Sequence, residues 1–418
     1  NLDRLILNFI DPSCFGPNVA RAQSRLIMLT KIPTYLFLLA SLILGMLLGG
    51  FFSDSLQGVA TSVNVAISVI IYLVPILIFV ALSPAIASLA DSGGANSLAG
   101  SVILWYLFTS FLAGLLGLSV STLLFGLSLS TSLDNPSGTM MTLLAPGESL
   151  SASRPLIAIL LAVCFGLLGT KWNFLRLFLE KVQSKVFYFG SKIKLVIVPF
   201  VLFLGISVGV RFGAQLGLTN YVLMTMYTFL LCLTWTTFYV FILLKLAKPH
   251  DVKEVTRDYL LPTAVFAAGT CSSLLTLPVN LANVKKQGVS ARIADFVLPV
   301  GSVINLDASA LAYVAYAPFV LSYLFGIQID LATLLMAWPA IVLFTIAAPG
   351  LPAGMGTALW SATLFASVLN LPENVASEFV ASWIAMSSGL PDMMRTATNC
   401  TSDGFASMIM EKFHGDSD

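Results

Sequence analysis

The stretch MSSGLPDMMRTATNCTSD, Met386 to Asp403, carries three charges inside the last long apolar segment of the chain. At the centre of a bilayer each such charge costs about 2.5–3.5 kcal/mol on insertion scales, so the charges need partners or a function. At helical spacing five polar residues of this stretch share one face: Ser388, Asp392, Arg395, Asn399 and Asp403. We predict one helix with a binding stripe. The alternative is that Asp392 and Arg395, three residues apart, only neutralise each other in a packed bundle.

The composition of the whole chain is that of a helical protein that crosses a membrane several times. Of its 418 residues, 57% are hydrophobic and 10% are charged. The mean hydropathy is +0.93, which is far too apolar for a soluble domain. Four charge-free runs are each long enough for a span of about 20 residues: 32–53, 55–90, 92–133 and 212–244. The chain is therefore predicted to be an all-α polytopic membrane protein.

Several function classes lack the residues that they need. With a net charge of +1 and no basic run that contains aromatic residues, we expect no nucleic-acid partner. The five cysteines are scattered and fit no disulfide or zinc spacing, and His250 and His414 lie in polar flanks. Ser272 or Ser273 with Asp392 could be imagined as a nucleophile and an acid, but no base accompanies them. We therefore expect neither an enzyme nor a bound cofactor.

The order of apolar and charged segments predicts the topology. The segments are an N-terminal region at 1–31, spans one and two in 32–90, span three in 97–126, a polar loop at 127–153, spans four and five in 154–214, and a C-terminal region at 219–412. Basic residues gather before span one, after spans four and six, and around Lys285, whereas loops near Asp134, Glu148 and Glu373 are acidic or neutral. By the positive-inside rule the basic side is cytoplasmic. Both termini are expected in the cytoplasm, the loop 127–153 outside the cell, and the protein in the cytoplasmic (inner or plasma) membrane.

Two segments of the C-terminal region are predicted to be re-entrant helical hairpins rather than spans. Leu331 to Pro372 holds 42 residues without a charge, but helix breakers in its middle, AAPGLPAGMG (Ala347 to Gly356), leave halves too short to cross. The segment Tyr259 to Val284 repeats this pattern with the tip GTCSSLLTLP, 269–278. Acidic flanks put the mouth of the later hairpin outside and basic flanks put that of the earlier one inside, which implies inverted repeats. The alternative is a pair of kinked ordinary helices.

Between the hairpins, the apolar segment Phe296 to Ile327 contains another buried carboxylate in the motif NLDAS, Asn305 to Ser309. An Asn beside an Asp in such a segment indicates an unwound helix whose free carbonyls and carboxylate bind a cation. Sodium and other hard ions prefer oxygen ligands of this kind. In span three, Tyr106, Thr109 and Ser110 could add oxygens, although hydroxyls in membrane helices often bond to their own backbone instead.

Taken in order, these motifs resemble those of the dicarboxylate/amino acid:cation symporter family, which contains the glutamate transporters and their archaeal aspartate-transporting relatives. The resemblance rests on YLFTS (106–110), TCSSLLTLP (270–278), NLDAS (305–309), APGLP (348–352) and DMMRTATNCTSD (392–403). It is strongest from Thr270 to Asp403 and weaker over the N-terminal spans. It implies the glutamate-transporter fold, with eight transmembrane helices and two re-entrant hairpins, at 253–288 and 331–371, related by inverted repeats.

The resemblance implies a site for an acidic amino acid on the last helix. Arg395 would pair with the side-chain carboxylate of the substrate, a task that suits the bidentate guanidinium, and Asp392 would hold the α-ammonium group. The implied substrate-binding residues are Arg395, Asp392, Thr396, Asn399, Ser273, Ser309, Leu351 and Pro352. An acidic amino acid is favoured because Asp392 would repel a plain dicarboxylate and a neutral amino acid would leave Arg395 unpaired.

The resemblance also implies two sodium sites. The ligands of the first would be Asp403, Asn399, Asn305 and the Gly301 carbonyl, and those of a deeper one Asp307, Asn305, Tyr106, Thr109 and Ser110. Departures from the family pattern occur at Val303, Leu306, Ala308, Ala347 and Ala348. These departures leave open the number of cations and the choice between sodium and a proton.

The function that the resemblance implies is secondary active import of glutamate or aspartate with cations, sodium being the first expectation. Spans one, two, four and five would form a scaffold, and the remaining elements (97–126 and 219–412) a transport unit that slides as an elevator within a homotrimer. Its partners would be the acidic substrate, cations and the lipid bilayer, with a co-transported ion in place of a cofactor. Two alternatives stay open: a proton-coupled C4-dicarboxylate carrier and an anion channel.

Overall fold

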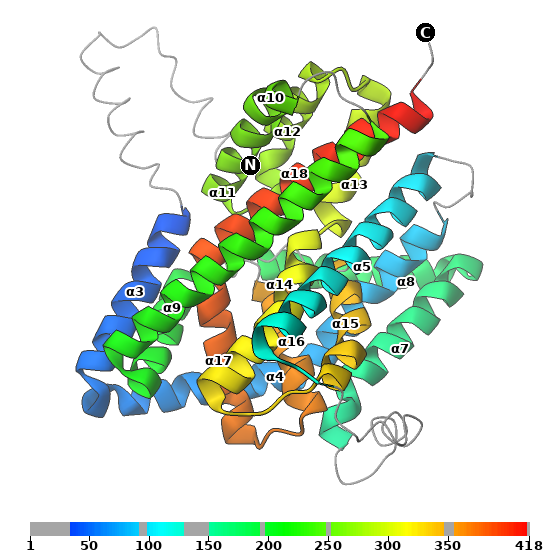
Figure 1. Ribbon diagram of the computed structural model, residues 1–418. Coiled ribbons are helices and arrows are strands. Elements are labelled where there is room, and N and C mark those ends of the chain that lie inside the picture. The colour runs from blue at the N-terminus through cyan, green and yellow to red at the C-terminus, as the bar shows by residue number, and fades with distance from the viewer. Residues whose placement is uncertain are drawn as a thin grey trace, which may run out of the picture.

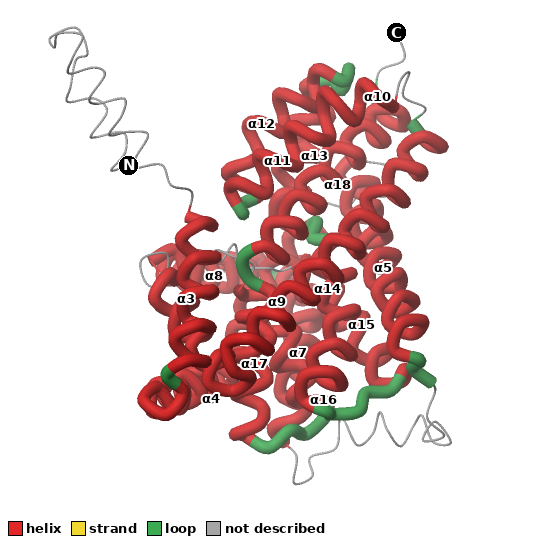
Figure 2. Tube along the Cα trace, turned by 60° about the vertical axis from the view of Figure 1, so that its left-hand side comes forward, coloured by secondary structure: helices red, strands yellow, loops and turns green. Residues whose placement is uncertain are grey.

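The computed structural model describes residues 34–91, 98–128, 150–192, 197–247, 252–346 and 355–415, and every regular element among them is a helix (Figure 1). In chain order the elements are α3 (Thr34–Phe51), α4 (Ser53–Asp91), α5 (Leu98–Phe125), α7 (Leu150–Lys171), α8 (Asn173–Lys192), α9 (Ile197–Leu246), α10 (Val252–Glu254), η4 (Val255–Leu260), α11 (Leu261–Thr270), α12 (Ser273–Lys286), α13 (Ala291–Ile304), α14 (Asp307–Pro318), η5 (Phe319–Leu324), α15 (Leu331–Ile346), α16 (Met355–Val368), α17 (Glu373–Ser387) and α18 (Leu390–His414), where η marks a π-helix. Figure 2 shows the same residues as helices joined by short loops.

Four of the described helical stretches are long and apolar enough to cross a membrane: Ser53–Pro84, Leu98–Phe125, Val198–Leu246 and Ala291–Leu324. Shorter apolar helices lie in α3, α7, α15 and α16. The predicted all-helical membrane protein with several apolar spans is therefore confirmed, whereas the total of eight spans and the domain limits stay predictions. The N-terminal region at 1–31 and positions 129–149 of the predicted loop lie outside the described residues, and α7 begins inside that loop.

α9 covers both segments that were expected as spans five and six, and its backbone leaves the helical conformation between them at Gly213. There φ is 75° and ψ is 161°, a conformation that glycine adopts readily and other residues avoid. This position divides α9 into a first arm, residues 197–212, and a second arm, residues 214–246. In the sequence, only Gly213, which follows Arg211 and Phe212, marks the boundary between the two expected spans, and no loop separates them.

α3 and the first arm of α9 pack backbone against backbone through glycine. A Cβ atom on Gly45 would overlap the Leu202 carbonyl oxygen, and a Cβ atom on Gly209 would overlap the Met46 carbonyl oxygen. Gly49 meets the backbone of α9 in the same way. Small residues at a helix crossing permit this close approach in membrane proteins. The glycine seam between these helices fixes their relative position.

The first predicted hairpin is present as two helical arms joined by a short turn. One arm runs through α10, η4 and α11, and the other is α12, with only Cys271 and Ser272 between them. Cys271 has φ 47°, and the Ser272 hydroxyl accepts a hydrogen bond from the Leu275 amide at 3.3 Å, which caps α12. The predicted tip, 269–278, is too long, because this cap starts α12 at once and residues 273–278 are helical.

α15 and α16 are the arms of the second predicted hairpin. They lie in the lower half of the molecule in Figure 1, whereas α11 and α12 lie at its upper end, and Figure 2 shows the same separation. The tip between α15 and α16, 347–354, lies outside the described residues, and with it Leu351 and Pro352 of the predicted substrate site, as well as Ala347 and Ala348. The described arms of the two hairpins therefore lie toward opposite ends of the molecule (Figure 1 and Figure 2).

The apolar segment with the NLDAS motif is broken where the sequence predicts a break. Asn305 (φ −104°, ψ 98°) and Leu306 (φ −124°, ψ 53°) separate α13 from α14. All the residues of α14 are buried, and it packs closely on α5 because a Cβ atom on Gly117 would overlap the Leu311 carbonyl oxygen. Asp307, the first residue of α14, is thereby enclosed in the protein.

A second break divides the last predicted span into α17 and α18. Ser388 is extended and Gly389 has φ 69°, while Pro391 stands in the first turn of α18, where the fixed φ of proline suits a helix start. The prediction that Ser388 lies on the same helical face as Asp392 and Arg395 is therefore wrong. The Gly-Leu-Pro sequence ends one helix and begins another, which periodicity alone does not reveal.

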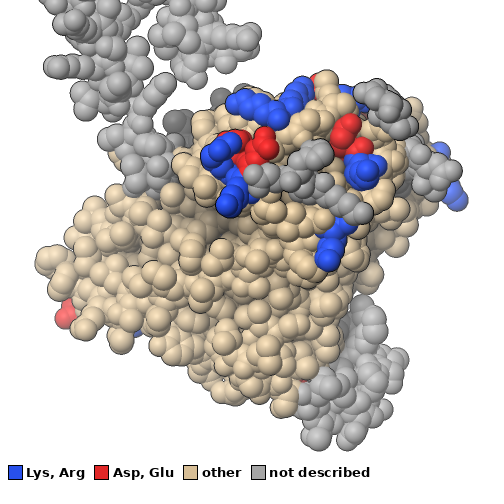
Figure 3. Space-filling view, turned by 45° about the horizontal axis from the view of Figure 1, so that its top comes forward, with Lys and Arg blue, Asp and Glu red and all other residues tan. Residues whose placement is uncertain are grey.

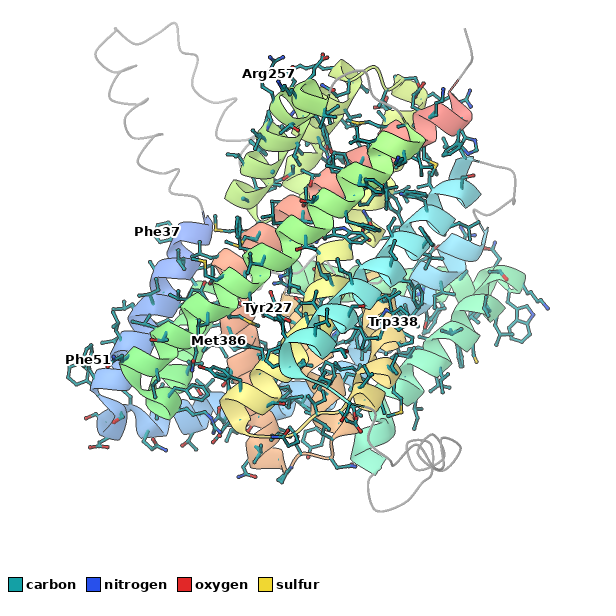
Figure 4. All side chains as sticks on the ribbon, in the orientation of Figure 1. Phe37, Phe51, Tyr227, Arg257, Trp338 and Met386 are labelled. Atoms are coloured by element: carbon teal, nitrogen blue, oxygen red, sulfur yellow. The ribbon has the colours of Figure 1, made fainter. Side chains whose placement is uncertain are left out.

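One face of the molecule is charged at one end and apolar below it (Figure 3). In the view of Figure 3, charged side chains gather over that end and the flank below carries almost none. Phe37 and Phe51 point away from α3 at the side of the molecule (Figure 4), with exposed fractions of 49% and 73%. At the charged end Arg257 bonds to Asp258 at 2.6 Å and lowers the pKa of that carboxyl. An apolar flank with a charged end suits a protein that is embedded in a bilayer.

Candidate functional site

A buried ion pair lies in the first turns of α18. The side chains of Arg395 and Asp392 are 1% and 6% exposed. Arg395 Nη2 donates to Asp392 Oδ1 at 3.1 Å and to the Ser387 carbonyl oxygen at 2.8 Å. Arg395 Nη1 and Asp392 Oδ2 are buried and make no hydrogen bond within the described residues. The pair is neutral as a whole, but it keeps one donor and one acceptor for a ligand.

Aromatic side chains surround the guanidinium of Arg395. Its Cζ atom lies 4.7 Å from the centroid of the Tyr313 ring, and Tyr313 stacks on Trp383 with a centroid distance of 6.3 Å. Tyr316 packs edge-on against both rings. No pattern in the sequence singles these residues out, because tyrosine and tryptophan in an apolar helix are ordinary core residues.

Asp307 meets the predicted hydroxyl cluster of α5. Thr109 Oγ1 and Ser110 Oγ donate to Asp307 Oδ1 at 3.1 and 2.9 Å, and all three side chains are buried. Asp307 Oδ2 is buried without a hydrogen bond in the described ranges. Tyr106 donates instead to the Val297 carbonyl oxygen at 3.0 Å. The hydroxyls and the carboxylate thus form one oxygen cluster that could hold a hard cation.

A second oxygen cluster lies where α18 passes the break between α13 and α14. Asn305 Nδ2 donates to Asp403 Oδ1 at 2.8 Å, and Asn305 Oδ1 is buried without a hydrogen bond among the described residues. Gly301 faces this cluster, because a Cβ atom there would overlap both the Asp403 carboxylate and the Tyr106 hydroxyl. Asp403, Asn305 and Gly301, three of the four residues predicted for the first sodium site, are therefore neighbours, and a side chain at position 301 would have to displace the Asp403 carboxylate and the Tyr106 hydroxyl.

Asn399 joins α18 to the start of α14. Its Oδ1 accepts a hydrogen bond from the Ala308 amide at 2.9 Å, one of the N–H groups that a helix N-terminus leaves without an internal partner. Thr396 and Ser309, which were also predicted for the substrate site, are buried on α18 and α14, and these two helices pack against each other. Asn399 thus ties the half of α18 that holds Arg395 to the broken helix.

The first hairpin is anchored to α18 by polar side chains that the sequence analysis did not select. Asn280 Nδ2 donates to the Cys400 carbonyl oxygen at 2.7 Å. The Tyr259 hydroxyl lies 3.0 Å from Asn280 Oδ1 and 3.1 Å from the Thr401 carbonyl oxygen. Ser273, at the start of α12, lies beside the Cys400 thiol. An asparagine in the middle of an apolar arm is the signal that could have pointed to this contact.

Tyr221 of the second arm of α9 holds the break between α17 and α18. Its hydroxyl donates to the Ser388 carbonyl oxygen and accepts from the Leu390 amide, both at 3.0 Å. One side chain therefore pairs two of the backbone groups at the interruption, one on each side of Gly389. The start of α18, with Asp392 and Arg395, is fixed from outside the helix.

Comparison with known proteins identifies the family. The model of the family described as "Sodium:dicarboxylate symporter family" matches residues 35–413. The chain belongs to the sodium:dicarboxylate symporter family. This result confirms the family that the sequence motifs suggested, and it places the protein among transporters and not among enzymes. Membership implies the glutamate-transporter fold, and together with the apolar helices it makes the chain an integral membrane protein.

Curated relatives of the symporter family align with parts of the chain. The putative sodium-dependent excitatory amino acid transporter glt-6 of Caenorhabditis elegans is 33% identical over 166 residues, which are 38% of this chain and 29% of the relative. The proton/sodium-glutamate symport protein of Bacillus caldotenax is 29% identical over 282 residues, 64% of this chain and 62% of the relative. Human excitatory amino acid transporter 2 is 33% identical over 149 residues, which are 35% of this chain and 24% of the relative. The alignments thus span less than two thirds of each relative.

Proposed function

We propose that the protein is a secondary active transporter that imports an acidic amino acid, glutamate or aspartate, together with cations, sodium being the first expectation. The observation that carries the proposal is the pair of unsatisfied atoms on neighbouring residues, Arg395 Nη1 and Asp392 Oδ2. A buried N–H group of a guanidinium is best paired with an anion. A buried carboxylate oxygen is best paired with a cation or a hydrogen-bond donor. An acidic amino acid carries both groups, a carboxylate on its side chain and an α-ammonium.

Rival substrates satisfy this pair less well. A C4-dicarboxylate would place its second carboxylate near Asp392, which repels it, and a neutral amino acid would leave Arg395 Nη1 without an anion. Asn399, Thr396, Ser273, Ser309, Leu351 and Pro352 are proposed to complete the substrate site. The printed names of the Bacillus and human relatives, glutamate symport and excitatory amino acid transport, agree with this substrate class.

Coupling to a cation is supported by the two oxygen clusters. Asp307 Oδ2 and Asn305 Oδ1 are buried oxygens without hydrogen bonds among the residues that the structure describes, and each lies beside further oxygen ligands. Sodium takes oxygen ligands of this kind. We assign one cation to Asp403, Asn399, Asn305 and the Gly301 carbonyl, and a second to Asp307, Asn305, Tyr106, Thr109 and Ser110.

The transport mechanism that we propose is an elevator. Residues 32–90 and 154–214 would form a scaffold within a homotrimer, and residues 97–126 and 219–412 a transport unit with the two re-entrant hairpins. The placement of the described hairpin arms toward opposite ends of the molecule (Figure 1 and Figure 2) supports an inverted repeat. The charged end that carries Arg257 would face the cytoplasm together with both termini, and the loop 127–153 would lie outside.

Uptake into proteoliposomes tests the proposal. Radiolabelled aspartate and glutamate are offered under a sodium gradient alone, a proton gradient alone and no gradient, with unlabelled succinate as a competitor. We expect uptake of at least one acidic amino acid that depends on sodium and resists succinate. Uptake that depends on the proton gradient and is blocked by succinate would favour the C4-dicarboxylate carrier instead. Currents that persist without substrate or cation gradients would favour an anion channel.

A further inference from the structure

Tyr313 lies where four helices meet. Its side chain is fully buried on α14. The Arg395 guanidinium of α18 lies over its ring at 4.7 Å, and the ring stacks on Trp383 of α17. The hydroxyl groups of Tyr313 and Thr357, a residue of α16, are 3.1 Å apart. One side chain of α14 therefore contacts α16, α17 and α18 at the same time.

The face of the Tyr313 ring attracts the Arg395 guanidinium, whose Cζ atom lies 4.7 Å from the ring centroid. The donors of arginine lie in the plane of the guanidinium, whereas an aromatic ring attracts a cation through its face. A carboxylate at this position would take the same donors that an anionic substrate needs. Arg395 Nη1 has no hydrogen bond within the described residues, so this nitrogen can still donate to an anion while the ring holds the guanidinium.

The hydroxyl of Tyr313 connects the arginine to the second hairpin. Thr357 is the third residue of α16 and therefore follows the hairpin tip closely in the chain. Thr357 is 4% exposed and Tyr313 is 0% exposed, so no bulk water replaces a broken bond between their hydroxyls. A displacement of the second hairpin arm at Thr357 would therefore act on the ring that lies under the guanidinium.

We propose that Tyr313 is a positioning residue for the substrate carboxylate. Its ring holds the Arg395 guanidinium while Nη1 remains available to the substrate, and its hydroxyl makes the position of the ring depend on the second arm of the second hairpin through Thr357. The carboxylate as ligand rests on the proposed function, whereas the contact between Tyr313 and Arg395 does not. The proposal is tested first without substrate and then by transport.

A mutant cycle in thermal unfolding tests the contact. Tyr313→Leu, Arg395→Met and the double variant are compared with the wild-type protein in the same detergent, without substrate. The double variant is expected to lose less melting temperature than the two single losses together, because each single variant already removes the same interaction. If the losses in melting temperature are additive, the proposed interaction between Tyr313 and Arg395 is wrong. Tyr316→Leu is the matched control, a buried tyrosine of the same helix that packs on the neighbouring rings, and its coupling with Arg395→Met should be clearly smaller.

Uptake of aspartate tests the role. Tyr313→Leu is expected to raise the KM for aspartate about tenfold or more, the size of a desolvated cation–π contact. Tyr313→Phe and Thr357→Val keep the ring and remove the bond between the hydroxyls. Each of them is expected to lower the turnover number several-fold with a KM within about twofold of wild type, and the double variant should be no worse than the worse single variant.

The possible failures are distinguishable. An unchanged KM for aspartate in Tyr313→Leu would contradict the positioning role. The same holds if the losses of turnover number in Tyr313→Phe and Thr357→Val multiply in the double variant. If Tyr313→Leu does not fold, Tyr313→Phe and Thr357→Val still decide whether the hydroxyl link exists. A wild-type protein that takes up neither glutamate nor aspartate would overturn the proposed function, and the thermal cycle would still decide whether Tyr313 holds Arg395.

Discussion

Within α18, Asp392 and Arg395 neutralise each other through one hydrogen bond of 3.1 Å, while each keeps a second polar atom without a partner among the described residues. Removing one member of such a pair leaves a buried charge, which costs about 3–5 kcal/mol, whereas replacing both by apolar residues can be nearly neutral. The stability of the protein and its ability to bind a charged substrate can therefore be separated by the choice of variant.

Arg395→Ala is expected to abolish uptake of acidic amino acids and to destabilise the protein by about 3–5 kcal/mol, because Asp392 is left buried and unpaired. The double variant Asp392→Leu with Arg395→Met should recover most of the stability and none of the uptake. Thermal unfolding and proteoliposome uptake on the same preparations measure both quantities. Glutamate and aspartate uptake at the wild-type rate in Arg395→Ala would contradict the assigned substrate class.

Asp403→Asn is expected to raise the sodium concentration needed for half-maximal substrate binding about tenfold or more, because it removes a negative charge from the proposed cation site. Substrate binding is measured by calorimetry over a series of sodium concentrations. Glu411→Gln is the control, since Glu411 lies on the same helix but bonds to Ser290 at the exposed end. If the substrate affinity does not change with sodium concentration in either the wild-type protein or Asp403→Asn, the proposed coupling to sodium is wrong.

At the scale of the elements, two interrupted helices face each other: α13 and α14 break at Asn305 and Leu306, and α17 and α18 break at Ser388 and Gly389. Asn399 links them by accepting from the start of α14. Each break leaves backbone groups that need partners inside an apolar environment. The side chains that supply these partners should be as important for folding as any apolar core residue.

Tyr221→Phe is expected to destabilise the protein by about 1–3 kcal/mol, because the Ser388 carbonyl and the Leu390 amide lose a shared partner in a buried position. The melting temperature of the purified protein reports this loss. Tyr227→Phe is a matched control from the same helix, since that hydroxyl donates to the Ala315 carbonyl oxygen at 3.2 Å, away from the break. An equal loss in both variants would show that the break does not depend on Tyr221.

The sequence predicted the elements whose signal is local. Asn305 and Asp307 in an apolar segment indicated a broken helix, and helix breakers separated the arms of the second hairpin. The second break was missed because the spacing of Asp392, Arg395 and Asn399 extends back to Ser388 by chance, although the backbone turns at Gly389. Local spacing reports which residues share a helix face only where one helix exists.

Apart from Asn280, whose amide in an apolar arm is a sequence signal, the supporting residues of the site could not be predicted because their contacts are long-range. Tyr221, Tyr259, Asn280 and Tyr313 act on α18 from segments that are far away along the chain. An aromatic residue in an apolar helix has the same appearance whether it packs on a lipid, a core residue or a buried arginine. Tertiary structure is needed to tell these cases apart.

At the scale of the whole molecule, a cleft of about 650 Å³ lies between α4, the first arm of α9 and α17. Arg211 and Glu378 form an ion pair across it, and the Arg211 guanidinium lies 4.2 Å over the Phe325 ring. In the proposed architecture Arg211 belongs to the scaffold and Glu378 to the transport unit. This contact must therefore break if the two units slide past each other.

A disulfide across this contact tests the sliding motion. In a background without the natural cysteines, Arg211→Cys with Glu378→Cys is expected to lose uptake about tenfold or more on oxidation and to recover it on reduction, because the cross-link holds one conformation. Asn64→Cys with Ser207→Cys joins two residues of the proposed scaffold that bond at 3.2 Å, and its oxidation should leave uptake unchanged. Normal uptake by the fully cross-linked Arg211→Cys and Glu378→Cys protein would show that α9 and α17 move together.

The glycine seam between α3 and α9 has a consequence for the solvent in which the protein is studied. Contacts such as that of Gly45 with the Leu202 carbonyl join backbone to backbone, so they order no side chain and need no water to be expelled. Dispersion and close Cα–H···O approach act equally in lipid and in detergent. The seam should therefore keep its geometry when the protein is extracted from a bilayer, and can serve as a fixed frame against which other helices are compared.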